Sequence, residues 1–401
     1  MFDLDRFIAE HVTKRPVSMF LCDIEQNRDR LQEKIKGKSV LVIGGAGSIG
    51  SSFIRALLPF EPSALVVADT NENALAELTR DLRSIPGMYM PEEYLPYPMD
   101  YSSDVFAKMF RSHSGFDIVA NFSAHKHVRS EKDVYSVEAL LNNNVLHLRN
   151  LLELLSEYPP EVYFCVSTDK AANPVNIMGA SKRIMEDVIF SYSDRFPVKT
   201  ARFANVAFSN GSLPDGFLAR IRKLQPISAP SDVKRYFVSP EESGQICLLS
   251  CILGENREIF FPKLQEEQMM TFDVIAEELL KAQGFEIQKC SSDEEAIEQA
   301  KHLKEGDNRY PVHFASSDTS GEKQYEEFVA DHEKADYEHF ISLGVITDKP
   351  IPDKTKLNQL FENLEEVFSN ITDKETVVSV LKTYLDNFEH IEIGKSLDSK
   401  M

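Results

Sequence analysis

The sequence predicts an α/β fold: a doubly wound parallel sheet with a smaller C-terminal lobe and helical extensions at both ends of the chain. Short apolar runs alternate with segments of helical periodicity between residues 38 and 203. A glycine-rich loop joins the first apolar run to the first helical segment, and beyond residue 203 the alternation weakens. Strands that alternate with helices in this way pair in parallel, and helices then cover both faces of the sheet.

The strands and helices follow one another regularly in the first half of the chain. Apolar runs predict strands at residues 39–43, 64–68, 97–100, 116–120 and 161–166. Helical spacing predicts helices at residues 51–58, 72–84 and 138–155. Ligands in such sheets bind beyond the carboxyl ends of the strands, so the residues that follow the predicted strands are the first candidates for a site.

The chain divides into four predicted segments. Residues 1–37 form a helical N-terminal extension, residues 38–203 the main α/β domain, residues 204–316 a loop-rich lobe, and residues 317–401 an acidic, mainly helical C-terminal extension. Within the last two segments, helical spacing returns at residues 272–282, 356–368 and 374–388.

The composition restricts the function. The 401 residues include 44 basic and 64 acidic side chains, which gives a formal net charge of −20. Such a surface repels nucleic-acid phosphates and anionic lipids, so we expect no nucleic-acid partner and no membrane partner. No run approaches the ~20 apolar residues of a membrane span. The five cysteines form no CxxC pair, which favours reduced thiols in the cytoplasm. No ligand-type spacing stands out, so we predict no metal site.

A phosphate-binding loop is predicted between the first strand and the first helix. Gly44, Gly47 and Gly50 form a GxxGxxG motif there, and Asp69 closes the next predicted strand. Glycines let a pyrophosphate approach the backbone N–H groups of a helix N-terminus, although similar loops also arise for packing alone. A carboxylate at the position of Asp69 accepts hydrogen bonds from the adenosine ribose and repels a 2′-phosphate. We therefore predict a Rossmann-type site that binds NAD, with NADP disfavoured.

Several later segments give the sequence a specific family resemblance. GxxGxxG is the form found in short-chain dehydrogenase/reductases. Residues 167–182 read Ser-Thr-Asp-Lys-Ala-Ala-Asn-Pro-Val-Asn-Ile-Met-Gly-Ala-Ser-Lys, which resembles the nucleotide-sugar 4,6-dehydratases of the polysaccharide-biosynthesis type within the extended branch of that superfamily. Residues 121–128, 142–145, 202–206, 209–212 and 234–237 continue the resemblance, which covers about residues 38–285. Its nearest relatives would be UDP- or GDP-N-acetylglucosamine dehydratases of bacterial surface-sugar pathways.

The resemblance implies which residues hold the cofactor and the substrate. The implied cofactor residues are Gly44, Gly47, Ser48, Ile49, Gly50, Asp69, Asn71, Asp100, Tyr101, Phe122, Ser123, Ala124, Lys126, Asn144, Ser167 and Lys182. The implied substrate residues are Lys126, Asn205, Ser212 and Arg235. It also implies that residues 38–203 bind NAD, that residues 204–316 bind a nucleotide sugar, and that the protein is a homo-oligomer.

The implied reaction is a dehydration without net oxidation. NAD+ takes a hydride from C4 of the sugar, water is lost across C5 and C6, and the hydride returns to C6. By the resemblance, Thr168 hydrogen-bonds O4, Asp169 is the acid at C6, Lys170 is the base at C5, and Lys182 binds the nicotinamide ribose. A hydroxyl, an acid and a base side by side at a strand end also suit proton transfer on general grounds.

Met178 departs from the superfamily pattern. A tyrosine normally stands four residues before the lysine that corresponds to Lys182, and it acts as the base for the C4 hydroxyl. A thioether has no proton to exchange. A membrane-anchored subgroup of the family shares this methionine, which argues against loss of activity. Our preferred hypothesis is that Asp169 acts first as base and later as acid, with Lys170 or a water bound to Thr168 as rivals.

Two other functions remain open at this point. A nucleotide-sugar epimerase or reductase would use the same scaffold, although an epimerase would normally keep the tyrosine. A non-catalytic NAD-binding module would regulate a partner through the acidic tail, and Met178 keeps that hypothesis open. The sequence leaves four features undecided: the UDP or GDP preference, the stereochemistry at C5, the oligomeric state, and the role of the terminal extensions.

Overall fold

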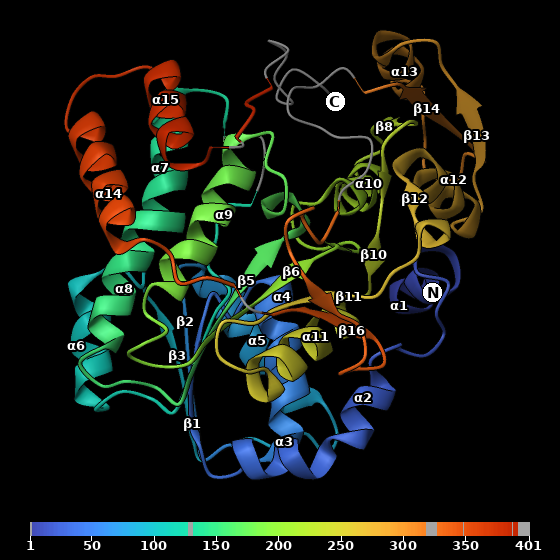
Figure 1. The fold of residues 1–401 in the computed structure, drawn as a ribbon. Coiled ribbons are helices and arrows are strands. Elements are labelled where there is room, and N and C mark those ends of the chain that lie inside the picture. Colours follow the sequence, from blue (N-terminus) through green and yellow to red (C-terminus); the bar gives the residue numbers. More distant parts are fainter. Residues whose placement is uncertain (1, 127–130, 318–326, 348, 387, 392–401) are drawn as a thin grey trace.

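A nine-stranded sheet forms the centre of the computed structural model, which describes residues 2–126, 131–317, 327–347, 349–386 and 388–391 (Figure 1). The strand order is β15-β16-β11-β6-β5-β4-β1-β2-β3. The strands are β1 (Ser39–Ile43), β2 (Ala64–Asp69), β3 (Glu93–Pro98), β4 (Ile118–Asn121), β5 (Val162–Thr168), β6 (Val198–Phe203), β11 (Ile259–Pro262), β15 (Ala335–Asp336) and β16 (Leu343–Ile346). From β3 to β11 all neighbours pair in parallel, whereas β15 and β16 are antiparallel. The predicted doubly wound α/β fold is confirmed.

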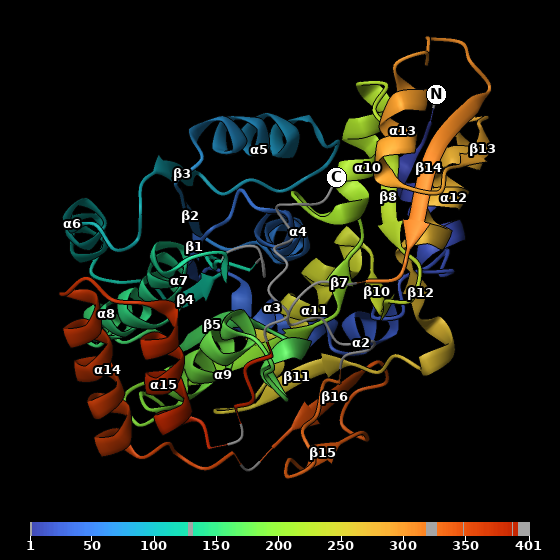
Figure 2. The same cartoon turned by 90° about the horizontal axis from the view of Figure 1, so that it is seen from above.

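Helices cover both faces of this sheet (Figure 2). One face carries α4 (Ser48–Leu57), α5 (Glu72–Ser84) and α11 (Pro240–Leu253), with α2 (Leu21–Gln26) and α3 (Arg28–Ile35) beside α11. The other face carries α6 (Asp104–Ser112), α7 (Val134–Leu141), α8 (His147–Leu155) and α9 (Ile177–Phe190). The central strands are continuous apolar runs because both of their faces are covered, and Val40, Leu41 and Val42 of β1 are fully buried.

A smaller lobe has a core of its own. Its sheet consists of β13 (Glu286–Lys289), β14 (Arg309–Ala315) and β8 (Ile227–Pro230), which are parallel. Its helices are α10 (Leu213–Arg222), α12 (Phe272–Ala282) and α13 (Asp293–Ala300). Two short pairs complete it: β7 (Asn205–Val206) with β10 (Phe237–Val238), and β9 (Lys234–Arg235) with β12 (Met270–Thr271). Phe7 of α1 (Leu4–Phe7) and the following Ile8 belong to the core of the lobe, so the N-terminal stretch packs there.

The C-terminal stretch contributes both to the main sheet and to an outer layer. Strands β15 and β16 extend the sheet beyond β11. The following hairpin of α14 (Lys354–Phe368) and α15 (Lys374–Tyr384) lies outside α7 and α8 (Figure 2). Arg149 of α8 donates to Glu365 at 2.7 Å, and its guanidinium lies 4.9 Å from the ring centre of Phe361. The sequence pattern predicted both helices but neither strand.

Three further features concern the described part of the chain. No helix there has both the length and the apolar character to cross a bilayer. No three His, Cys, Asp or Glu side chains among these residues are grouped as metal ligands. All five cysteines are free thiols, and four of them are buried.

Candidate active site

A cavity of about 960 Å³ lies between the main sheet and the lobe. Its walls include the carboxyl ends of β5 and β6 and parts of α10, β8 and β14. The predicted site residues that line it are Ile49, Phe122, Ala124, Lys126, Ser167, Thr168, Asp169, Lys170, Lys182, Asn205 and Ser212. The predicted residues that are not among its described lining are Gly44, Gly47, Ser48, Gly50, Asp69, Asn71, Asp100, Tyr101, Ser123, Asn144 and Arg235. The structure therefore brings all of the predicted catalytic residues together in one cavity.

The three glycines of the predicted phosphate loop differ in what they do. A Cβ on Gly44, where φ is +71°, would lie 2.7 Å from the backbone nitrogen of Ser123. A Cβ on Gly50 would lie 2.4 Å from the carbonyl oxygen of Gly44. Packing therefore requires glycine at both positions. A Cβ on Gly47 would meet that oxygen at 3.4 Å, an ordinary contact, so packing does not explain this glycine. Close approach of a ligand does explain it.

Asp69 and the start of α4 border this loop. Asp69 accepts hydrogen bonds from the backbone N–H groups of Ala46 at 3.0 Å and Asn71 at 2.9 Å, which fixes its carboxylate at the end of β2. Among the described residues, no side chain caps the N-terminus of α4, so its first N–H groups are free to meet an acceptor. Ser48, the first residue of α4, accepts from the backbone N–H of Asn210 in the lobe at 2.9 Å. The arrangement fits an anionic group such as a pyrophosphate.

Thr168, Asp169 and Lys170 meet at one carboxylate oxygen. Asp169 Oδ1 accepts from the Thr168 hydroxyl at 2.8 Å, from the Lys170 backbone N–H at 2.9 Å and from Lys170 Nζ at 3.0 Å. The Asp169 side chain is only 4% exposed, although it lines the cavity. The trio therefore stands as predicted at the end of β5, connected so that protons can move between its members.

Helix α9 carries Met178 and Lys182 along the cavity wall. Lys182 Nζ donates to the carbonyl oxygen of Val166 at 2.6 Å and contacts Met185 Sδ at 3.1 Å. Burial lowers the pKa of Lys182 to about 8. Met178 is buried, lines the cavity and holds Glu131 through its backbone N–H at 2.8 Å. The position of the superfamily tyrosine is thus filled by an apolar side chain that faces the site.

Two residues implied as cofactor ligands make contacts within the protein. Tyr101 donates to the carbonyl oxygen of Asn143 at 2.6 Å, and burial raises the pKa of its phenol, which stays a neutral donor. The Asn144 side chain bonds both the N–H and the C=O of His125 at 3.0 Å and donates to Ser181 at 3.0 Å. Both donors of the Asn144 amide are therefore used, and Asn144 holds the segment after β4 against α9.

Two arginines of the lobe, Arg220 and Arg235, stand differently towards the cavity. Arg235 is buried, donates to the carbonyl oxygen of the preceding residue and is not among the described lining. Arg220 of α10 lines the cavity instead. It donates to the carbonyl oxygen of Gly216 at 3.2 Å and forms no ion pair with any described carboxylate. Sequence reasoning missed Arg220 because nothing in the local pattern shows which face of α10 meets the cavity.

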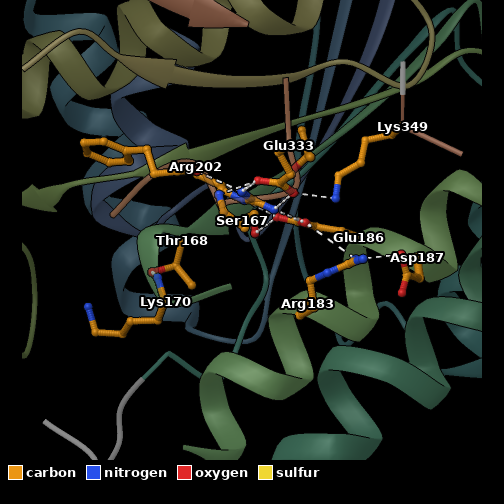
Figure 3. A network of polar contacts seen from close by, with 12 residues as sticks. Ser167, Thr168, Lys170, Arg183, Glu186, Asp187, Arg202, Glu333 and Lys349 are labelled. Atoms are coloured by element: carbon orange, nitrogen blue, oxygen red, sulfur yellow. Dashed lines mark hydrogen bonds and ion pairs between the residues drawn. The ribbon is translucent and has the colours of Figure 1, made fainter. Parts of the chain in front are cut away.

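A buried charge network lies directly behind the end of β5 (Figure 3). Ser167 donates to Glu186 at 2.7 Å, and Arg202, which is fully buried, binds Glu186 at 2.8 and 2.9 Å. Arg202 also binds Glu333 at 2.8 Å, and Lys349 pairs with Glu333 as well. Burial would raise the pKa of Glu333, but Arg202 and Lys349 outweigh it and lower that pKa to about 2. The sequence analysis did not predict this network.

Comparisons with known proteins fit this architecture. The family model described as "Polysaccharide biosynthesis protein" matches residues 40–347. An uncharacterized membrane protein of Methanocaldococcus jannaschii is 29% identical over 86% of this chain and 96% of its own length. EpsC of Bacillus subtilis, a probable polysaccharide biosynthesis protein, is 26% identical, and the match spans 84% of this chain but about half, 52%, of EpsC. A UDP-N-acetylglucosamine 4,6-dehydratase (inverting) of Campylobacter jejuni is 27% identical over 57% of this chain and 67% of its own length.

Solved structures share the fold. Pen from Bacillus thuringiensis superposes with a TM-score of 0.63 at 19% identity, over 82% of this chain and 98% of that one. DesIV from Streptomyces venezuelae, a dTDP-glucose 4,6-dehydratase with NAD bound, superposes with a TM-score of 0.55 at 18% identity, over 73% of this chain and 88% of that one. The chain therefore belongs to the polysaccharide biosynthesis protein family, as the resemblance predicted, and it shares the fold of Pen and DesIV.

Proposed function

We propose that the protein is an NAD-containing 4,6-dehydratase that acts on nucleotide-linked N-acetylglucosamine. The observation that carries the proposal is the meeting of Thr168, Asp169 and Lys170 at a single oxygen inside the cavity. Elimination of water from a sugar needs a proton removed at one carbon and a proton supplied to the leaving oxygen, and a carboxyl and an amine 3.0 Å apart provide both.

The residues present fit the dinucleotide. Gly47 leaves room for a pyrophosphate at the uncapped start of α4, and the fixed carboxylate of Asp69 suits a ribose with a free 2′-hydroxyl, which favours NAD over NADP. Lys182, which lines the cavity, would bind the nicotinamide ribose. When bound, the nicotinamide accepts a hydride from C4 of the sugar and returns it to C6.

The chain's own side chains would handle the protons. Thr168 hydrogen-bonds the C4 oxygen, and Asp169 takes the proton of that hydroxyl, since Met178 has none to exchange. Lys170 removes the proton from C5, and Asp169 gives its proton to the departing C6 oxygen, which leaves as water. As the hydride returns to C6, Lys170 gives a proton back to C5, so both side chains regain their starting protonation states. Lys170 and a water bound to Thr168 are the rival bases for the C4 hydroxyl.

Cations and hydroxyls on the cavity wall would hold the rest of the substrate. Lys126 and Arg220 approach from two sides, and Arg220 has no carboxylate partner among the described residues. An unpaired guanidinium on a cavity wall suits a diphosphate, because its planar donors bind two oxygens at once. We therefore assign the diphosphate to Arg220 in place of Arg235. Asn205 and Ser212 complete this wall.

Incubation of the purified full-length protein with UDP- and GDP-N-acetylglucosamine in deuterated water tests the function. A dehydratase yields a product lighter by one water with deuterium at C5, and NAD appears when the protein is denatured. A 4-epimerase, the activity named for several similar proteins, yields an isomer without loss of water, and a binding module yields neither product. Asp169→Asn and Lys170→Met should each reduce dehydration at least a hundredfold. An isomer formed without loss of water, or no product at all, from the wild-type chain overturns the proposal.

A further inference from the structure

Three polar side chains gather at the end of the cavity that lies in the lobe. Ser228 of β8 and His313 of β14 are direct partners in the parallel ladder, so their side chains leave neighbouring strands on the same face. Asp293, the first residue of α13, lies against both of them. All three line the cavity, and none was predicted as a site residue.

The hydrogen bonds within this cluster fix what it offers to a ligand. Asp293 Oδ1 accepts from His313 Nδ1 at 2.6 Å and from the Ser228 hydroxyl at 3.0 Å. A ring nitrogen that donates to a carboxylate carries the proton, which leaves His313 Nε2 as an acceptor in the neutral ring. Asp293 Oδ2 receives no hydrogen bond from any described residue. The Asp293 side chain is 29% exposed and the His313 side chain 18% exposed, so the cluster keeps two solvent-accessible acceptors at the cavity wall, Asp293 Oδ2 and His313 Nε2.

We propose that Asp293 and His313 form the nucleoside subsite and bind two adjacent hydrogen-bond donors of the substrate. The inference rests on the proposed function: if the sugar reacts at Thr168 to Lys170, its nucleotide extends along the same cavity into the lobe. Two parts of a nucleotide present adjacent donors. One is the ribose 2′,3′-diol, and the other is the N1–H and 2-amino edge of guanine. The uracil edge has one N–H between two carbonyls and does not fit a pair of acceptors.

Calorimetric binding to the wild-type holoenzyme separates these two sources. We would titrate UDP against 2′-deoxy-UDP and GDP against IDP, which lacks the 2-amino group. If the cluster binds the diol, 2′-deoxy-UDP binds at least tenfold more weakly than UDP, whereas GDP and IDP bind alike. If it binds guanine, IDP binds at least tenfold more weakly than GDP. A site that is built to hydrogen-bond a substrate group rejects the analogue without that group. Equal affinities within both pairs overturn the inference.

Asp293→Asn with a matched control assigns the effect to the cluster. The amide replaces an acceptor by a donor, so the affinity for the preferred nucleotide should fall at least tenfold and the discrimination within its pair should disappear. Glu294→Gln removes the same charge from the next residue of α13, which is exposed. This control should change neither the affinity for the nucleotide nor the discrimination within its pair. Wild-type affinity and discrimination in Asp293→Asn contradict the inference. If the wild-type chain binds none of the four nucleotides, the proposed function itself fails, which is a different outcome from a loss of discrimination.

Discussion

Gly47 differs from the other two glycines of the loop because packing does not require it, whereas the binding of a ligand does explain it. Gly44 and Gly50 are fixed by backbone contacts of the loop itself, whereas packing leaves room for a side chain at Gly47. Lys182 gives a second example, because its amino group is buried against Val166 and Met185 without a carboxylate partner among the described residues. Each residue leads to a prediction.

Gly47→Ser should leave the fold intact and weaken dinucleotide binding. Serine is a favoured N-cap residue, so the free energy of unfolding should stay within about 1 kcal/mol of wild type or rise. The new side chain would occupy the space at the start of α4, and the Kd for NAD should increase at least tenfold. Gly50→Ala is the reverse control: overpacking against the Gly44 carbonyl should cost about 1–3 kcal/mol. Wild-type NAD affinity in Gly47→Ser would refute this interpretation of the loop.

Lys182→Met should change how stability depends on pH. Burial lowers the pKa of Lys182 from 10.5 to about 8, so between these values the folded state holds fewer protons on this amine than the unfolded state. Wild-type stability therefore rises with pH through that window, and the variant lacks this rise. Urea unfolding measures the difference in free energy of unfolding between the variant and wild type. This difference should be lower at pH 10 than at pH 7 by on the order of 2 kcal/mol. The exposed Lys108→Met in α6 serves as the control. A difference independent of pH would argue against the buried, lowered-pKa amine.

At the scale of elements, a buried ion network binds β5 to distant parts of the chain. Arg202 on β6 binds Glu186 on α9, which also accepts from Ser167 on β5. The other carboxylate, Glu333, comes from the C-terminal stretch just before β15 (Figure 3). The strand end that carries Thr168 is thereby linked, through Glu186 and Arg202, to a carboxylate of the C-terminal stretch.

Glu333→Gln should be strongly destabilising. It leaves the fully buried Arg202 with one carboxylate instead of two, and breaking a buried ion pair costs about 3–5 kcal/mol. The exposed pair of Arg111 and Glu157 provides the control, since Glu157→Gln should cost less than about 1 kcal/mol. Because the pKa of Glu333 is lowered to about 2, its contribution is complete above pH 4.5 and is lost as the pH falls towards 2. Urea unfolding at pH 7 and pH 3 measures both effects, and equal losses in the two variants would contradict the prediction.

At the scale of the whole molecule, the sheet is assembled from residues far apart in the sequence. Strands β15 and β16 follow the lobe in the chain and return to the main sheet beside β11 (Figure 1). The lobe forms one wall of the cavity, and the chain is part of the main sheet both before it enters the lobe and after it leaves. A C-terminal stretch that is acidic in sequence is, in the structure, part of the core.

Truncation tests this dependence. A chain that ends at residue 316 loses β15, β16, Glu333 and Lys349, and it should lose cooperative unfolding because Arg202 keeps a single carboxylate and β11 loses its partner. A chain that ends at residue 353 keeps these elements and loses the α14–α15 hairpin with the residues that follow it, so it should still unfold cooperatively. Circular dichroism during thermal unfolding distinguishes the two. Wild-type cooperative unfolding in the shorter chain would show that the C-terminal stretch is dispensable.

The local parts of this architecture were predictable from sequence, and the non-local parts were not. Apolar runs, the glycine loop and the run from Ser167 to Lys182 are local signals, and they predicted the fold class and the position of the candidate site. Arg202 and Glu333 are 131 residues apart, and no local pattern connects them. Arg235, which the resemblance assigns to the substrate, is buried without being among the described lining of the cavity, and no local pattern shows which wall such a side chain will face. Strands β15 and β16 are two and four residues long, too short for a periodic signal.

The two margins of the central sheet restrict how copies of this chain can associate. At one margin, β3 carries Pro96 and Pro98, which have no N–H to offer to an incoming strand. At the other margin, β15 has only two residues, so it offers very little backbone for pairing. Growth of the sheet from one molecule to the next is thus obstructed at both sides. The margins of the central sheet therefore offer little backbone for pairing between folded copies, so this sheet should not seed β-fibrils from the folded state.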